Sequence, residues 1–534
     1  MRTLHAVTSR RRAALGLAAC CGVGVLVSSV LGVTYDARHS SHAGFEHVRV
    51  CDTHAPVGFR RPRRTVVVVV DGLGHVEAEQ MASMGRLATE GQCRTMDVGP
   101  LSVSRPVYAV LSTGLEQDRT GVRGNDDAAP LAAQSIWDVA HAAGMSVSVV
   151  SELTWWGELF PHAFDDELVA PRADDYFRMA PRADLQLIHP VYVDEAGHES
   201  GAASASYRAA VGRADSEIGE MLDSLDLSLD LVVVTADHGH SLRGGHGGTQ
   251  ERVAHVLTCY AGLGVRHLSE RGSMRATTFA PALAVLLGVA FPEEMRAGGD
   301  DLDTIFAITD PAAFPPGYLA ERRATIEHFR DENRAELRRR LPSCHGSWER
   351  FHDEAQALQL WRASLVFLCV ALVMVAQARR HLRHDGVRGA AFGVVFVLGG
   401  YMGLLITQLV VRGSFDLSSV STGNDFIAFT VLMALAWSAL GVLVHTYARA
   451  SVSALLADWS ALSIVGTLLA LAHTAAFGWR VGYPAPSAEL QFFPYFATLS
   501  LASIQGVGLV VAAFVVLRRK KEPGPTASES SATR

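Results

Sequence analysis

The chain has few cysteines and no excess of positive charge. Its 534 residues include 7 cysteines, and none forms a Cys-x-x-Cys pair, so a structural zinc knuckle is not supported. The formal net charge of −7 gives no reason to expect a nucleic acid as partner. Cys51, Cys93, Cys259 and Cys344 lie in the polar part of the chain. An oxidising compartment would allow one or two disulfides there, in a pairing that the sequence does not give.

Long uncharged runs occur in the N-terminal flank of the chain and after residue 358. The hydrophobic fraction is 49% and the mean hydropathy is +0.19, which is high for a soluble protein. Residues 13–33 form an uncharged apolar run, and a bilayer span needs ~20 apolar residues. This run is either an uncleaved signal anchor or an export signal that is removed. Five more apolar runs cover residues 358–377, 389–411, 426–447, 459–478 and 495–517.

The basic residues around these runs predict one orientation. Three consecutive arginines at 10–12 directly precede the first run, four arginines lie at 378–388, and four consecutive basic residues occupy 518–521. The loops at 412–425 and 479–494 carry one arginine each. Because cytoplasmic loops are enriched in arginine and lysine, we expect six spans with both termini in the cytoplasm and residues 36–355 outside it.

The chain therefore divides into five predicted segments. They are an anchor at 1–35, an extracytoplasmic domain at 36–316, a charged helical connector at 317–357, a five-helix transmembrane domain at 358–517 and a basic cytoplasmic tail at 518–534. In the extracytoplasmic domain, apolar strands at 64–70, 187–189 and 231–236 alternate with helical patterns at 75–89, 203–225 and 280–287, and residues 133–151 read as helix then strand. This alternation predicts an α/β fold, with a mixed, mostly parallel sheet sandwiched by helices.

Polar side chains follow the ends of these apolar strands. Asp71 follows the first strand and Asp194 and His198 follow the second. Asp237, His238 and, after a glycine-rich turn, His246 follow the third. The carboxyl ends of parallel strands meet at one edge of a sheet, where ligands are usually placed. Imidazoles with carboxylates suit zinc better than calcium or magnesium, although a polar loop with incidental histidines is the plainer interpretation.

Ser104 lies two residues before Pro106, at the expected start of a helix. A helix N-terminus favours an attacked phosphate, and the alternative is that Ser104 only caps the helix. Two cations ~3.5–4 Å apart can clamp the attacking and leaving oxygens of an in-line displacement. A serine beside them would form a covalent phospho-serine intermediate, which divides the reaction into two easier steps.

The order of these motifs resembles the alkaline phosphatase superfamily, in particular its phosphodiesterase and nucleotide pyrophosphatase branch. The motifs are Asp71-Gly-x-Gly, Ser104-x-Pro with Thr113-Gly, Asp194-x-x-Gly-His198, Asp237-His238-Gly and His246-Gly-Gly, over about residues 64–305. The resemblance implies two zinc ions. One would be held by Asp71, Ser104, Asp237 and His238, and the other by Asp194, His198 and His246. It also implies that Asn125 binds a phosphate oxygen, the alternative being a turn asparagine.

A narrower resemblance lies in the segment from Thr154-Trp155-Trp156-Gly157 to Pro161 and in His189. Both are similar to the ethanolamine-phosphate transferases of GPI-anchor synthesis. The resemblance implies transfer of a phosphoethanolamine-like group from a phospholipid to a glycan or lipid hydroxyl at a membrane. The alternative is a phosphodiesterase or pyrophosphatase that hydrolyses phosphoesters. A sulfatase, a binding module and a lipid transporter with a phosphatase-like accessory domain are weaker alternatives, and Tyr108 stands where sulfatases have an arginine.

Several other polar or aromatic residues have open roles. His75 and His240 either neighbour the ligands or are solvated, and His189 is either a core histidine or such a neighbour. We expect Trp155 and Trp156 to pack within the domain or to belong to a lid over the site. Gln408 and His473 lie toward the outer ends of their spans, where ionisable groups are functional candidates by default and helix–helix hydrogen bonds are the alternative.

Overall fold

A computed structural model gives the fold of the chain. It describes residues 12–27, 58–120, 122, 124–125, 129–131, 133–170, 176–180, 182–292, 299–328, 368–380, 382–383, 386–413, 415, 417–420, 423–447, 451–477 and 493–517. The predicted tail at 518–534, most of the predicted connector, Cys51, Cys344 and the side chain of His473 lie outside the described residues. The boundaries of the five segments stay predictions.

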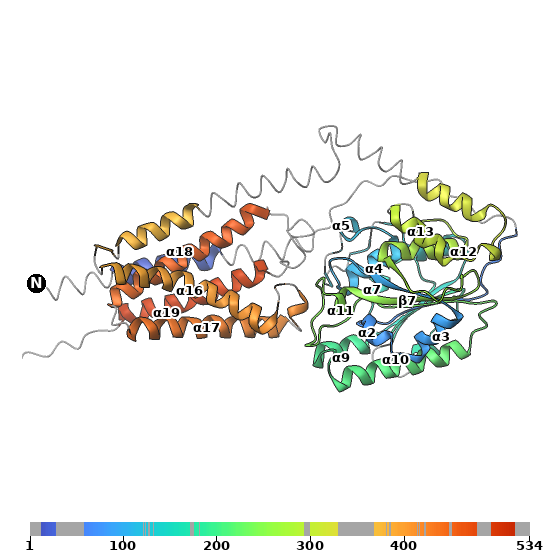
Figure 1. Ribbon diagram of the computed structural model, residues 1–534, viewed down its shortest axis with the longest axis horizontal. Helices are drawn as coiled ribbons and strands as arrows, with labels where there is room; N and C mark the ends of the chain where they lie inside the picture. The colour runs from blue at the N-terminus through green and yellow to red at the C-terminus, as the bar shows by residue number, and fades with distance from the viewer. Residues whose placement is uncertain are drawn as a thin grey trace, which may run out of the picture.

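An eight-stranded sheet forms the centre of the larger domain (Figure 1). Its strands are β1 (Thr65–Val69), β2 (Gly91–Asp97), β3 (Val147–Ser151), β4 (Asp166–Val169), β5 (Leu185–His189), β6 (Leu231–Thr235), β7 (His255–Gly262) and β8 (Gly272–Arg275). They lie in the order β4-β3-β5-β1-β6-β7-β2-β8, and β7 runs antiparallel to β6 and to β2 while the other neighbours are parallel. The predicted mixed, mostly parallel α/β fold is confirmed.

Helices cover both faces of this sheet. Figure 1 shows α2, α3, α9 and α10 on one face and α4, α12 and α13 on the other. The helices of the domain are α2 (His75–Ala78), α3 (Ala82–Glu90), α4 (Ser104–Thr113), α5 (Gln117–Thr120), α6 (Ile136–Ala142), α7 (Trp155–Leu159), α8 (Tyr176–Met179), α9 (Tyr192–Ser200), α10 (Ala205–Asp223), α11 (Glu251–Ala254), η1 (Ala276–Thr278), α12 (Phe279–Leu287), α13 (Gly299–Ile308) and η2 (Pro311–Ala313). Because both faces are covered, β1 and β6 are buried along their whole length, as their unbroken apolar sequences predict.

Two parts of the domain differ from the sequence prediction. The single helix expected at 75–89 is two helices, α2 and α3, with Met81 in extended conformation between them. The strands β2, β4, β7 and β8 were not expected. For example, β2 has the polar residues Gln92, Arg94 and Thr95 and gives no apolar run. A disulfide joins Cys93 of β2 to Cys259 of β7, which are paired across the antiparallel ladder.

The C-terminal part of the chain is a bundle of apolar helices. It contains α16 (Gly386–Arg412), η3 (Leu417–Ser419), α17 (Gly423–Tyr447), α18 (Val452–Phe477) and α19 (Phe493–Leu517). Four of these helices are long and apolar enough to cross a membrane, so the chain is a membrane protein. They match the predicted runs at 389–411, 426–447, 459–478 and 495–517, while the run at 358–377 is described only from residue 368, where a helix reaches residue 380.

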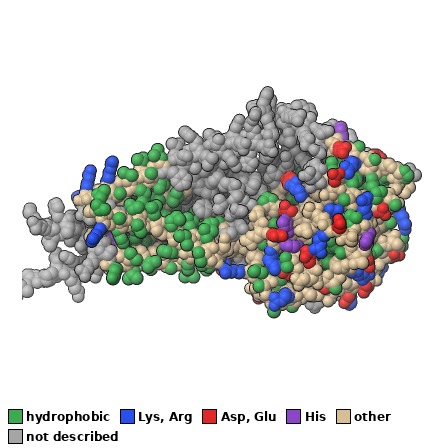
Figure 2. Space-filling model, viewed as in Figure 1, with side chains coloured by type: hydrophobic (Ala, Val, Ile, Leu, Met, Phe, Trp, Pro, Cys, Tyr) green, Lys and Arg blue, Asp and Glu red, His purple; other side chains and the backbone are tan. Residues whose placement is uncertain are grey.

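Residues 12–27 form a further apolar helix that packs into this bundle. Its residues Ala14, Leu17 and Cys21 are buried in the same cluster as Trp459 and Ile504. The outer surface of the bundle is apolar, whereas charges of both signs are scattered over the larger domain (Figure 2). The larger domain lies at the end of the bundle where α16 is followed by η3 and α17 (Figure 1).

Candidate metal centre

Two neighbouring strands place the first group of polar residues. Asp71 follows β1, and Asp237 and His238 follow β6, which pairs with β1 in parallel through Val69 and Thr235. Their carboxyl ends therefore lie at the same edge of the sheet, and the Gly72 N–H donates to Asp237 Oδ1 at 3.0 Å. Gly72 has φ +76°. A Cβ there would lie 2.6 Å from the Cα of Asp194, so only glycine lets this turn approach α9 so closely.

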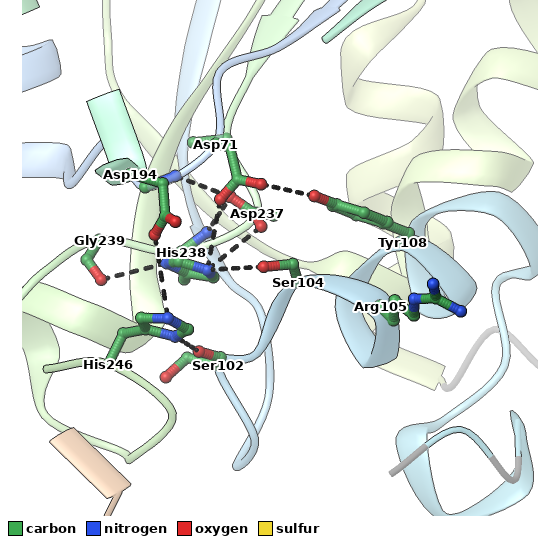
Figure 3. A network of polar contacts seen from close by, with 12 residues as sticks. Asp71, Ser102, Ser104, Arg105, Tyr108, Asp194, Asp237, His238, Gly239 and His246 are labelled. Carbon is green, nitrogen blue, oxygen red and sulfur yellow. Dashed lines mark hydrogen bonds and ion pairs between the residues drawn. The ribbon is translucent and has the colours of Figure 1, made fainter. Parts of the chain in front are cut away.

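Asp71, Asp237 and His238 converge on one buried point (Figure 3). The Nδ1 atom of His238 faces the carbonyl oxygen of Gly239 at 3.3 Å, so this nitrogen has the hydrogen and Nε2 has a lone pair. That Nε2 lies 3.5 Å from Asp71 Oδ1 and 3.3 Å from Asp237 Oδ2, and both oxygens are buried without a hydrogen-bond donor. The lone pairs of one nitrogen and two carboxylate oxygens therefore face one another in a buried site. Such an arrangement fits a bound cation, which would accept all three.

The pKa values in this group follow from its burial. Burial lowers the pKa of His238 to about 3, so its ring is neutral and able to serve as a ligand. Burial and then the charge of Asp71 raise the pKa of Asp237. Burial also acts to raise the pKa of Asp71, but the hydrogen bonds that its carboxylate makes with His189 and Tyr108 help to lower it overall. Two carboxylates in one buried site cannot both be ionised easily unless a positive charge lies between them.

The second group combines one helix and one loop. Asp194 and His198 lie one turn apart on α9, rather than in a loop after a strand, and so share a face of this helix. His198 Nε2 lies 3.5 Å from Asp194 Oδ2 and 2.9 Å from Nε2 of His246, which the loop after β6 provides. His246 Nδ1 donates to the carbonyl oxygen of Ser102 at 2.9 Å, which leaves its Nε2 lone pair directed at the group.

His240 is part of this second group and is not solvated. Its side chain is fully buried, with Nδ1 at 2.8 Å from the Gly244 carbonyl oxygen and Nε2 at 2.8 Å from Asp194 Oδ1. The ring therefore fixes the direction of the Asp194 carboxylate. By contrast, His75 lies apart from the site, with its Nδ1 3.2 Å from the carbonyl oxygen of His255. A buried histidine and a solvated one have the same sequence signal, so only the fold separates them.

Ser104 lies at the N-terminus of a helix, next to the first group of ligand candidates. It is the first residue of α4, Val103 is the N-cap, and the Ser104 Oγ lies 3.2 Å from His238 Nε2. The interpretation of Ser104 as a simple N-cap is therefore wrong. Asn125 Oδ1 accepts the Arg105 N–H at 3.1 Å, which places this amide beside Ser104 and leaves its NH₂ group as the donor. The structure thus gathers every predicted site residue around one edge of the sheet.

Tyr108 is a neighbour of the site that sequence reasoning missed. Its hydroxyl donates to Asp71 Oδ2 at 2.6 Å and lies 2.8 Å from His189 Nε2, while Ser151 Oγ lies 2.8 Å from the other nitrogen of that ring. Trp156 is fully buried and stacks on the Tyr108 ring at 4.3 Å. Trp156 and His189 belong to the narrower resemblance. Trp156 contacts Tyr108, and His189 contacts both Tyr108 and Asp71, so these two residues help to hold the Asp71 carboxylate in place. In the sequence, the one sign of a special role for Tyr108 was that it stands where sulfatases have an arginine.

We expect Tyr108→Phe to lower metal affinity or kcat/KM by about 10- to 100-fold, because the substitution leaves Asp71 Oδ2 with one hydrogen bond fewer. Metal content of the purified variant and its kinetics on a phosphodiester provide the measurement. Tyr260→Phe is the matched control, since Tyr260 is also fully buried but its hydroxyl meets only Met274 Sδ at 3.9 Å. Equal effects of the two substitutions would contradict a specific role for Tyr108.

Comparison with known proteins identifies the kind of domain. Residues 173–270 match the Metalloenzyme superfamily, and this range contains Asp194, His198, Asp237, His238 and His246. This region resembles metalloenzyme-superfamily proteins, and we call the larger, sheet-containing domain around it the metalloenzyme domain. This match supports the predicted alkaline-phosphatase-like superfamily at that level, and it supports an enzyme that binds divalent metal. Among curated proteins, none matches the chain.

Solved structures with a similar fold cover the metalloenzyme domain. They include PH0037 from Pyrococcus horikoshii, with 15% identity, a TM-score of 0.33 and coverage of 42% of this chain and 97% of that chain. Murine ectonucleotide pyrophosphatase/phosphodiesterase 5, in complex with AMP, has 12% identity, a TM-score of 0.37 and coverage of 43% and 96%. A putative sulfatase from Bacteroides thetaiotaomicron has 14% identity, a TM-score of 0.38 and coverage of 48% and 77%.

Proposed function

We propose that this chain is a membrane-bound phosphotransferase that uses Ser104 as its nucleophile. It moves a phospho-alcohol group, of the phosphoethanolamine type, from a phospholipid to a glycan or lipid hydroxyl. The observation that carries the proposal is the position of the Ser104 Oγ at the first turn of α4, 3.2 Å from His238 Nε2. A serine hydroxyl directed at a cluster of metal-type ligands matches the requirement of a covalent phosphoryl-transfer site.

The residues have separate tasks in this reaction. Two divalent cations, which the donor set suggests are zinc, would supply Lewis acidity that lowers the pKa of the Ser104 hydroxyl and offsets phosphate charge. Asp71, Asp237, His238 and Ser104 would hold one of them, and Asp194, His198 and His246 the other.

The transfer itself takes two displacements. A bond forms between Ser104 Oγ and phosphorus while the bond to the leaving glyceride oxygen breaks, and the proton lost by Ser104 balances the one that this oxygen gains. In the second displacement the acceptor oxygen forms a bond to phosphorus while the bond from Ser104 Oγ to phosphorus breaks, and the proton lost by the acceptor hydroxyl balances the one that Ser104 regains. The Asn125 NH₂ group donates to a phosphate oxygen throughout.

Several features support a reaction outside the cytoplasm. The Cys93–Cys259 disulfide fits an oxidising compartment. Arginines gather at the end of the bundle away from the metalloenzyme domain (Figure 2), as the positive-inside rule expects of a cytoplasmic end. The helix at 12–27 packs into the bundle core, which favours a retained anchor over a removed signal. With the helix from residue 368, this arrangement would give six spans with both termini inside.

Hydrolysis of phosphoesters is the alternative for the second step. The His198 side chain is 35% exposed, so water can approach the second group directly. A phosphodiesterase or pyrophosphatase would use the same Ser104 chemistry and differ only in the acceptor. The sulfatase alternative has weaker support, because Tyr108, which stands where sulfatases have an arginine, donates a hydrogen bond to Asp71.

A product assay separates transfer from hydrolysis. Full-length protein in lipid nanodiscs would be given phosphatidylethanolamine labelled in its head group, with and without a short acceptor glycolipid. We expect diacylglycerol release to match label gained by the acceptor. Label that appears only as free phosphoethanolamine, whatever acceptor is present, would replace the transferase by the hydrolase. An aryl phosphodiester and an aryl sulfate serve as controls for reaction class, and turnover of the sulfate alone would overturn both.

A further inference from the structure

The loop that carries His246 touches the membrane bundle as well as its own domain. On its own side, the Ser102 Oγ donates to the Gly248 carbonyl oxygen at 2.7 Å and accepts the Gly247 N–H at 3.0 Å. On the other side, the Gly248 N–H donates to Ser418 Oγ of η3 at 2.9 Å. The turn after His246 is thus held between the two domains by two serines.

Close backbone approach marks the same contact. A Cβ on Gly245 would lie 2.4 Å from the carbonyl oxygens of both Ser418 and Val420, so any larger residue would separate the loop from η3. Ser418 is 3% exposed, and the neighbouring Ser419 is also buried. The contact is buried and the two backbones approach closely, unlike a loose encounter of two surfaces.

The contact continues into α16. The Arg243 guanidinium donates to the carbonyl oxygen of Val411 in the last turn of α16, where carbonyl groups have no partner within the helix and a positive charge is favourable. The Gln408 Nε2 lies 3.5 Å from Ser419 Oγ, so the polar residue in this span supports η3. A chain of polar contacts therefore runs from the span to the turn that carries His246.

We propose that Ser418 is a positioning residue of the enzyme, through which the membrane domain fixes the His246 loop and completes the second group of ligands. The inference rests on the proposed role of His246 as a ligand. Ser418 touches neither substrate nor metal, and it acts through the Gly248 N–H. Without it the loop keeps its anchor at Ser102 but loses the one at η3, so His246 is less well ordered relative to Asp194 and His198.

Metal titration of the full chain in detergent tests this inference. Apo protein is titrated with Zn²⁺ against a chelating dye, and with Co²⁺ by its visible absorption. In Ser418→Ala we expect one class of site to lose about 10- to 100-fold in affinity while the other stays unchanged. Ser418→Thr keeps the hydroxyl and restores the affinity. In kinetics, kcat falls in Ser418→Ala while KM for the lipid stays constant.

Matched variants separate positioning from general damage. Ser460→Ala removes a hydroxyl that bonds only within α18, and Gly212→Ala adds a methyl group where nothing lies within 4 Å. Neither should change either metal affinity, whereas Gly245→Ala should reproduce the effect of Ser418→Ala and provides the test if that variant does not fold. Unchanged affinities, or an equal loss at both sites, would overturn the inference. Because binding is measured directly, these outcomes hold even if no phosphotransfer is detected.

Discussion

Ser104→Ala is expected to lower kcat/KM on phosphodiesters by about 10³-fold or more, because the nucleophile is lost and only binding and electrostatic stabilisation remain. Thermal stability should stay near that of the wild type, and the metal should stay bound through its three other ligands, since Asp71, Asp237 and His238 keep their positions. With head-group-labelled phospholipid, wild-type protein quenched in acid should hold covalent label on the peptide that contains Ser104. The alanine variant should hold none.

The matched control for Ser104→Ala is Ser83→Ala. Ser83 is also a buried serine at the start of a helix, but it lies in α3 on the opposite face of the sheet and its Oγ has no hydrogen-bond partner. Its loss should leave activity unchanged. Label that persisted in Ser104→Ala, or turnover within a few-fold of wild type, would show that another group attacks phosphorus.

Removal of the metals is expected to abolish activity and to destabilise the metalloenzyme domain. Metal bound only to the folded state adds about 4 kcal/mol of stability when its free concentration is about a thousand times Kd. Chelation removes this contribution and leaves Asp71 Oδ1 and Asp237 Oδ2 buried without a partner. Thermal unfolding of the protein with and without a chelator measures the loss, and added Zn²⁺ should restore both Tm and turnover.

Asp237→Asn tests the same prediction through the sign of its effect on stability, with metal and without it. Asp237 Oδ1 accepts the Gly72 and His238 N–H groups, and an asparagine oxygen can accept both. The substitution therefore removes only the second carboxylate oxygen and its repulsion with Asp71. We expect the variant to be less stable than wild type with metal, and more stable than wild type after chelation. The same order of stability in both conditions would mean that no cation neutralises this pair.

The sequence was sufficient for the parts of the site that depend on local pattern. Unbroken apolar runs identified β1 and β6, and residues that follow parallel strands must meet at one edge of the sheet, so Asp71 and Asp237 could be placed together. Asp194 and His198 were predicted as ligands, but their helix was not, because their four-residue spacing fits a loop as well as a helical turn.

Contacts between distant segments were beyond the sequence. Tyr108 has the ordinary signal of a core aromatic residue, and its bond to Asp71 depends on where α4 crosses β1. The antiparallel strand β7 brings Cys259 beside Cys93, a pairing that needs the sheet order. The approach of Ser418 to Gly248 joins residues 170 positions apart, and no periodicity in either segment predicts it.

The packing of η3 against the loop that carries His246 has a consequence for how a substrate would reach the site. Since η3 joins two helices that are long and apolar enough to be spans, the proposed orientation would place the candidate metal ligands close to the plane where phospholipid head groups end. Under the proposed function, a lipid donor would then reach Ser104 by lateral diffusion along a surface, and its encounter rate would depend on the mole fraction of donor in the leaflet instead of its bulk concentration. Inert lipid would act as a diluent, so for the proposed transferase the bilayer would be the reaction medium as much as the anchor.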